Sequence, residues 1–120
     1  MRNRHSKYNN HKVTIDGIVF DSRKEGQFYQ TLKRWEKDGR IKDLECHPVY
    51  ELQPRFEVKK KGKMRVHRPI TYSPDFRFWD NEEKRVRVVD AKGARTEVYL
   101  IKKKLFDWKF KGELYLEETL

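Results

Sequence analysis

The chain has 120 residues, 40% of them charged and 36% hydrophobic, which allows one modest hydrophobic core. Its net charge of +10 favours a polyanionic partner such as DNA or RNA. The single cysteine, Cys46, excludes a disulfide framework and a cysteine zinc site. No apolar run approaches the ~18 residues of a membrane span, so we expect a cytoplasmic protein without a membrane partner.

Residues 1–12 are polar and basic and contain no hydrophobic stretch, so they do not resemble a secretory signal. We expect them to form a flexible basic arm in front of a single domain at residues 13–120. Residues 13–20 place β-branched residues on both sides of an Asp-Gly pair, which predicts a β-hairpin.

A helix is predicted from Ser22 to about Asp38, and Gly39 should end it. Its apolar stripe consists of Phe28, Tyr29, Leu32 and Trp35. The stretch from Leu44 to about Val58 contains two prolines and predicts one or two bent strands. Residues 59–63 form a basic tip that is typical of a hairpin turn, and strand-like residues resume near Met64 and Tyr72.

Residues 75–80 and 85–92 predict two paired strands around a turn at 81–84. Thr96 or its neighbour should cap a second helix that runs to about Phe110, and residues 113–118 predict a closing strand. We expect Val98, Ile101, Leu105 and Trp108 to form the buried face of this helix. The element order predicts an α/β or α+β fold with helices flanking a central mixed β-sheet.

The paired strands bring two acids together. With a turn at 81–84, Asp75 lies opposite Asp90, and directly opposed side chains on one sheet face are about 4.5–5.5 Å apart at Cβ. Two carboxylates this close repel each other unless one is protonated or a cation lies between them. Mg²⁺ prefers such oxygen ligands. Lys92 lies two residues after Asp90 on the same face, where its ammonium can orient water or stabilise charge on a phosphate.

Structural explanations exist for each of these residues. Asp75 is also suited to cap a turn, and Lys92 to solvate a sheet edge. Glu25 stands three residues after Ser22, which is the spacing of a capping box, yet it shares a helical face with Phe28 and Leu32. Capping and a role beside the other acids therefore both remain open for Glu25.

These residues, in this order, resemble the PD-(D/E)xK nuclease superfamily, which has the restriction-endonuclease-like fold. The matching positions are Glu25 on a helix, Pro74-Asp75 on a strand and Asp90-Ala91-Lys92 on the next strand. More narrowly, residues 13–118 are similar to small phage-encoded endonuclease-like proteins related to Holliday junction resolvases. The segment from Phe20 to Glu25 resembles their entry into the first helix, and Lys92-Gly93 resembles their approach to a basic helix.

The resemblance implies a Mg²⁺ or Mn²⁺ ion held by Asp75, Asp90 and the carbonyl of Ala91. It implies that Glu25 acts through a water or a second metal, and that Lys92 positions or activates the attacking water. Hydrolysis of the phosphodiester would leave a 5′-phosphate. The Asp-x-Lys triplet replaces the commoner Glu-x-Lys, and its shorter acid would shift the metal.

Many positive residues are candidates for contacts with the nucleic-acid backbone, with a merely solvated basic surface as the alternative. They are Arg2, Arg4, Lys7, Lys59, Lys60, Lys61, Lys63, Arg65, Arg68, Arg95, Lys102, Lys103 and Lys104. Lys103 lies on the helix that follows Lys92, which in the resembling enzymes often lends a polar residue to the active site. The histidines His5, His11, His47 and His67 lack zinc-site spacing, so we expect surface or structural roles for them.

The leading hypothesis is a metal-dependent DNA endonuclease, structure-selective and resolvase-like, acting in phage DNA recombination or replication as a homodimer in the bacterial cytoplasm. A nickase or terminase accessory enzyme would use the same chemistry. A nonenzymatic DNA- or RNA-binding module and a ribosome-associated protein are the alternatives from other classes. None of these hypotheses calls for a small-molecule cofactor.

Overall fold

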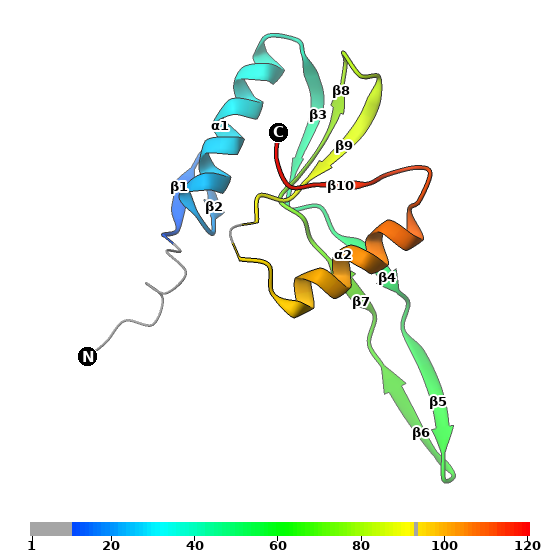
Figure 1. Ribbon diagram of the computed structural model, residues 1–120. Helices are drawn as coiled ribbons and strands as arrows, with labels where there is room; N and C mark the ends of the chain where they lie inside the picture. Colours follow the sequence, from blue (N-terminus) through cyan, green and yellow to red (C-terminus); the bar gives the residue numbers. More distant parts are fainter. Residues whose placement is uncertain (1–10, 93) are drawn as a thin grey trace, which may run out of the picture.

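The computed structural model describes residues 11–92 and 94–120. It has a mixed α+β architecture, in which a four-stranded sheet lies between two helical layers and a long two-stranded ribbon projects from the body (Figure 1). The general class therefore agrees with the sequence-based expectation. Most of the expected N-terminal arm lies outside the described residues, as do Arg2, Arg4 and Lys7.

The first elements follow the sequence closely. β1 (Val13–Ile15) and β2 (Ile18–Phe20) form the predicted hairpin. The hydroxyl of Ser22 caps α1 (Arg23–Lys37), and Gly39 adopts a left-handed φ of 78° after the helix. Gly26 faces the hairpin at very short range, because a Cβ atom there would lie 2.8 Å from Cγ2 of Val13. The missing side chain thus lets α1 approach β1.

The main sheet has the order β10-β9-β8-β3. Its strands are β3 (Ile41–Cys46), β8 (Phe76–Asp80), β9 (Arg85–Val89) and β10 (Leu116–Glu117). Neighbours pair antiparallel except β9 and β10, which run parallel. Trp79 pairs with Val86 and Phe76 with Val89, so the register expected for the acid-bearing strands is confirmed.

The stretch predicted as one or two bent strands contains three. β3 begins earlier than expected, and β4 (Tyr50–Gln53) and β5 (Phe56–Lys60) follow it, separated by Pro48 and Pro54. The reason is that neither proline can donate a ladder hydrogen bond, so each marks a break between strands. β4 pairs with β7 (Ile70–Tyr72), and β5 pairs with β6 (Lys63–His67). We call residues 56–67 the basic ribbon; its turn at Lys61-Gly62 confirms the predicted basic tip.

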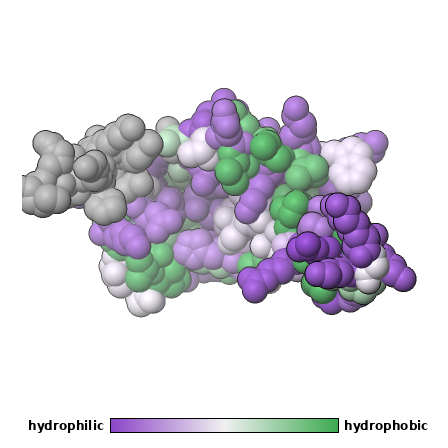
Figure 2. All heavy atoms as spheres, turned by 90° about the horizontal axis from the view of Figure 1, so that it is seen from below, coloured by the Kyte–Doolittle hydropathy of each residue, from purple (hydrophilic) through white to green (hydrophobic). Residues whose placement is uncertain are grey.

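The second helix is α2 (Glu97–Lys109), capped by Thr96 as expected. The prediction of its buried face is wrong except at Leu105, which is half-buried and packs against the core cluster around Phe106. Its buried residues are Tyr99 and Phe106, whereas Ile101 and Trp108 are 60% and 63% exposed, and Val98 is exposed as well. The two aromatic rings fill the space against Leu52 and Tyr72, because aromatic side chains bury the largest areas. Figure 2 shows a hydrophobic patch over α2, next to the strongly hydrophilic ribbon.

Two hydrophobic clusters lie on opposite faces of the sheet. Phe76, Phe78 and Val89 pack with Leu32 and Tyr29 of α1. Their strand neighbours point the other way, and Val88 and Leu116 pack with Phe106 of α2. Each face of the sheet therefore has its own helix.

A buried ion network ties β9 to the C-terminal segment. The guanidinium of Arg87 donates to Asp80 at 3.3 Å, to Glu117 at 2.8 Å and to the carbonyl of Leu120 at 3.0 Å. These bonds satisfy a charge that would be costly to bury alone. Neither helix of the described residues is long and apolar enough to span a membrane.

Candidate metal centre

The two strand acids lie where the β8–β9 ladder ends. Asp75 directly precedes β8 and Asp90 directly follows β9, one position beyond the last pair, Phe76 and Val89. Asp75 is 7% exposed and Asp90 only 1%. The structure thus brings together the two carboxylates that the sequence predicts to face each other, and it buries both.

Two of the four carboxylate oxygens of these acids accept hydrogen bonds, and one of the other two is buried without a partner among the described residues. Oδ2 of Asp75 accepts a hydrogen bond from the backbone N–H of Ala91 at 2.7 Å. Oδ2 of Asp90 accepts one from the hydroxyl of Tyr72. Oδ1 of Asp90 is buried without a hydrogen-bond partner among the described residues. Buried polar atoms nearly always have a bonding partner. An unpartnered buried oxygen is therefore available as a ligand for a cation.

Glu25 reaches the same place from the first turn of α1. Its backbone N–H donates to Ser22 Oγ at 3.2 Å, which is one half of a capping box. Its carboxylate is buried, and it has a potential ligand atom within 4.8 Å of those of Asp75 and His47. The side chain therefore lies beside Asp75, while the backbone N–H takes part in capping. We refer to Glu25, Asp75 and Asp90 as the acid cluster.

His47 approaches the acid cluster from the end of β3. Its backbone N–H donates to the carbonyl of Asp75 at 2.8 Å, and its ring lies 5.8 Å from that of Phe20. Its φ of 55° is left-handed, a conformation that turns the chain sharply after β3. His47 is exposed, as expected of a surface histidine, and in addition its ring can contribute a nitrogen beside two carboxylates.

Lys92 lies at the edge of the site. Its Nζ is 3.6 Å from Oδ2 of Asp90 and 5.0 Å from the centre of the Tyr99 ring. The side chain remains partly exposed, so its ammonium can meet both the buried acid and a ligand arriving from solvent. Ala91, between the two charged residues, is buried, and its carbonyl as a metal ligand stays a prediction.

The electrostatics of the acid cluster are unfavourable without a cation. Burial raises the pKa of Asp90 to about 7, and the charge of Asp75 adds to this rise. Burial likewise raises the pKa of Asp75 to about 6, with a further contribution from Glu25. The pKa of Glu25 is also raised, mainly by burial. A divalent cation would compensate these charges, and the oxygen-rich donor set, including the free Oδ1 of Asp90, fits one.

A comparison with protein families gives one match, which covers residues 5–117 and is described as a protein of unknown function (DUF1064). The chain belongs to the DUF1064 family. No curated protein and no solved structure matches it. The family assignment of this DUF1064 protein therefore states no activity, and its chemistry has to be inferred from the geometry.

The basic candidates of the DUF1064 chain are spread over three regions. Lys59, Lys60, Lys61, Lys63 and Arg65 are exposed along the basic ribbon, and Arg68 follows it. Arg95 forms an ion pair with Glu118 at 3.4 Å. Lys102, Lys103 and Lys104 lie on α2, where Lys103 pairs with Asp107 at 3.1 Å, one turn further along the helix. The observed partner of Lys103 is thus on its own helix.

Two residues of the site escaped the sequence analysis. His47 stands opposite Asp75 only because β3 pairs with β8, with Cys46 beside Phe76. Tyr72 reaches Asp90 from β7. Neither residue carries a recognisable spacing relative to the acids, so a correct prediction of the β3–β8 pairing would have been the one usable signal for His47.

Proposed function

We propose that this protein is a metal-dependent DNA endonuclease of the PD-(D/E)xK type with a restriction-endonuclease-like core. The observation that carries the proposal is the buried pair Asp75 and Asp90 with Lys92 beside it and one carboxylate oxygen unpartnered among the described residues. The order of the elements also supports it: a helix with Glu25, two antiparallel strands with the acids, then a helix and a parallel strand.

In this proposal Asp75 and Asp90 hold Mg²⁺ or Mn²⁺ together with the carbonyl of Ala91. Glu25 and His47 complete the set, either directly or through water. When bound, the metal would neutralise charge on the scissile phosphate and lower the pKa of a water. The chain's own residues prepare the site for it, since Tyr72 and the Ala91 N–H fix one oxygen of each strand acid.

Lys92 would supply the remaining catalytic group. Its ammonium is within reach of Asp90 and remains partly exposed, so it can hold a water in line with a phosphorus atom or donate to a phosphate oxygen. The ring of Tyr99 lies under the ammonium and restricts its motion. Negative charge that develops on the phosphate would meet a positive group already in place.

The homodimer expected of a resolvase-like enzyme is part of the proposal, with the exposed face of α2 as its surface. Val98, Ile101 and Trp108 form an apolar stripe on this helix. In an antiparallel pairing of two copies of α2, Glu97 at one end would lie near Lys111, which follows the other end of the helix. Charge complementarity and opposed helix dipoles thus favour a second copy as the partner.

The proposal is tested by cleavage of a labelled four-way junction, with linear duplex and single strand as further substrates. Each reaction is run with Mg²⁺, Mn²⁺ or EDTA. We expect metal-dependent cutting that is lost in K92A and kept in K37A, which removes an exposed lysine at the far end of α1. Preference for the junction would support a resolvase-like role in phage DNA recombination or replication.

A second variant separates chemistry from binding. D75N should abolish cleavage and leave DNA affinity largely intact, because Asp75 is buried and cannot form a large part of a DNA-binding surface. Binding without cutting under every metal condition would instead favour the nonenzymatic nucleic-acid-binding module, for which the acids are structural.

A further inference from the structure

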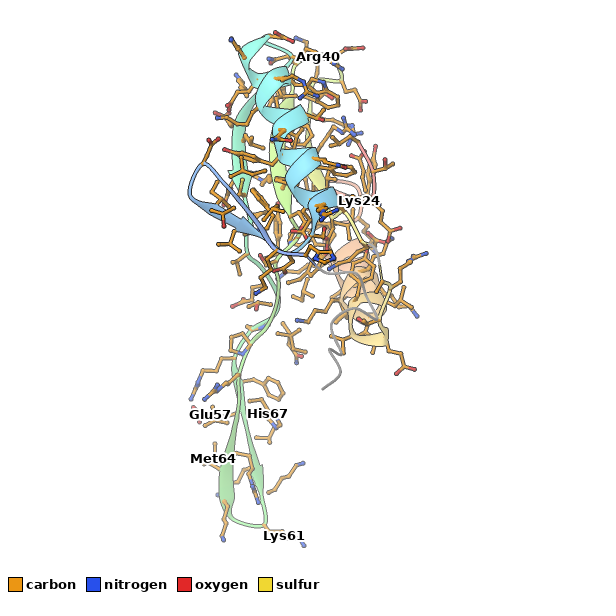
Figure 3. All side chains as sticks on the ribbon, turned by 90° about the vertical axis from the view of Figure 1, so that its left-hand side faces the viewer. Lys24, Arg40, Glu57, Lys61, Met64 and His67 are labelled. Atoms are coloured by element: carbon orange, nitrogen blue, oxygen red, sulfur yellow. The ribbon has the colours of Figure 1, made fainter. Side chains whose placement is uncertain are left out.

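The basic ribbon is built unlike the rest of the molecule. β5 and β6 pack chiefly against each other, and none of the ribbon's residues is fully buried. The projecting ribbon makes the protein less compact. The radius of gyration of the protein is 17.4 Å, against about 14 Å for a compact chain of this length. Figure 3 shows Glu57, His67, Met64 and Lys61 along this projection, far from Lys24 and Arg40 near the two ends of α1. A two-stranded hairpin is only marginally stable on its own, so a bound partner would stabilise the ribbon.

The register gives the ribbon two different faces. Directly paired residues point to the same side, and successive pairs alternate. Three pairs share one side, which we call the cationic face: Phe56 with His67, Val58 with Arg65, and Lys60 with Lys63. The opposite side carries Glu57 with Val66 and Lys59 with Met64. Positive charge is therefore concentrated on one face.

The charges of the cationic face are uncompensated. Among the described residues, Lys60, Lys63 and Arg65 form no ion pair. The single acid of the ribbon, Glu57, is on the other face and pairs with Arg55 at 2.7 Å. A polyanion is thus the partner that this face fits.

The dimensions of the ribbon select among polyanions. Two paired strands are about 4.8 Å apart, and five residues extend about 17 Å. The major groove of B-form DNA is about 12 Å wide and about 8.5 Å deep and admits a two-stranded β-ribbon. The minor groove, about 6 Å wide, is too narrow, and the major groove of A-form RNA is deep and narrow.

We propose that the basic ribbon inserts into the major groove of duplex DNA, with its cationic face toward the DNA and the Glu57 face away from it. The inference deepens the proposed function and shares with it the choice of DNA as substrate. The ribbon would hold duplex at a distance from the cleavage site, and each lysine of the cationic face would displace counterions from a phosphate.

The ribbon is connected to the acid cluster by a very short path. β6 leads into β7, whose last residue, Tyr72, donates its hydroxyl to Asp90. Only Ser73 and Pro74 separate Tyr72 from Asp75. The strand that anchors the ribbon therefore also positions the acids, so that duplex bound at the ribbon has a defined direction relative to the site.

The test compares two lysines of the same hairpin. DNA affinity is measured in EDTA, where no cleavage occurs, for K63A on the cationic face and K59A on the opposite face. The plot of log affinity against log salt has a negative slope, which should become shallower by about 1 in K63A and stay unchanged in K59A. Equal losses in the two variants would overturn the assignment of the faces, and no loss in either would overturn the proposal.

A triple variant, K60A/K63A/R65A, should lower duplex DNA affinity on the order of 10²-fold at 0.1 M salt. The control R34A/K37A/K42A removes the same charge from exposed positions on α1 and β3 and should have a small effect. Duplex RNA should bind the wild type much more weakly than duplex DNA of the same sequence. Equal binding of RNA, or an equal effect of the control triple, would refute the groove model.

Removal of the whole ribbon gives an independent check. Because Gln53 pairs with Ile70, an Asn-Gly turn in place of residues 54–69 would join β4 to β7 directly. The shortened protein should lose duplex affinity and keep Mn²⁺ binding at the acid cluster. If it fails to fold, the point variants still decide. Ribbon-dependent binding without metal-dependent cleavage would reject the proposed endonuclease and keep the ribbon, whereas cleavage with ribbon-independent affinity would do the opposite.

Discussion

Replacing Asp90 by asparagine should stabilise the metal-free protein above neutral pH. In the wild type a buried carboxylate faces Asp75, and one of its oxygens has no hydrogen-bond partner among the described residues. The asparagine keeps an oxygen for the Tyr72 hydroxyl and places an amide where the unpartnered oxygen was. The amide can donate to Asp75, so repulsion is replaced by a hydrogen bond.

The size and the pH window follow from the raised pKa. A rise from 3.8 to about 7 corresponds to about 4 kcal/mol at about 1.4 kcal/mol per pH unit, which is an upper limit for ionised Asp90. The folded state binds more protons than the unfolded state between these values, so wild-type stability should fall as pH rises from about 4 to about 7. Asp75, with a pKa raised to about 6, acts in the same direction.

The assay is urea unfolding in EDTA at pH 5 and pH 8. D90N should exceed the wild type by about 1–3 kcal/mol at pH 8, and the difference should shrink toward pH 5. The exposed control D43N, at a left-handed position that asparagine tolerates, should show no such pH dependence. A D90N protein less stable than wild type by more than about 1 kcal/mol at pH 8 would refute the electrostatic reasoning. Asp90 would then be a structural carboxylate.

Three further outcomes are expected. H47A should weaken Mn²⁺ binding in calorimetry on the order of tenfold, because imidazole is a favoured ligand of transition metals. The control H67A, on the ribbon, should leave Mn²⁺ affinity unchanged. Equal affinities of the two variants would show that His47 does not belong to the site. I101E should convert the proposed dimer into a monomer in sedimentation experiments, since it places a charge on the exposed stripe of α2. An unchanged dimer would point to another interface. R87A should lower the free energy of unfolding by about 3–5 kcal/mol, because it takes the guanidinium away from buried Asp80 and removes its bonds to Glu117 and the carbonyl of Leu120. R85A should cost less than about 1 kcal/mol, and similar losses in the two variants would contradict the special role of the buried network.

The parts of the fold that depend on neighbouring residues were predictable. The β1–β2 hairpin, the Ser22 and Thr96 caps and the strand register around residues 81–84 are all set by local turn and capping chemistry. The opposition of Asp75 and Asp90 follows from that register, so the centre of the candidate site could be placed from the sequence.

The parts that depend on long-range pairing were not predictable in the same way. α2 carries two apolar stripes, and only the tertiary packing of Tyr99 and Phe106 decides which one is buried. His47 joins the site through the pairing of β3 with β8, some thirty residues apart in sequence. Local periodicity contains no information about either choice.

Gly26 has a consequence for how this site can change during evolution. A side chain at position 26 would collide with Val13 and Ile15, at 2.8 and 3.1 Å from the added Cβ, and the collision would push the first turn of α1 outward. Glu25 is the adjacent residue on that turn, so its carboxylate would leave its place beside Asp75. The β1–β2 hairpin thus sets the position of an acid without contributing any atom to the site. A larger residue at position 26 should arise only together with a smaller one at 13 or 15, so the three positions are expected to covary.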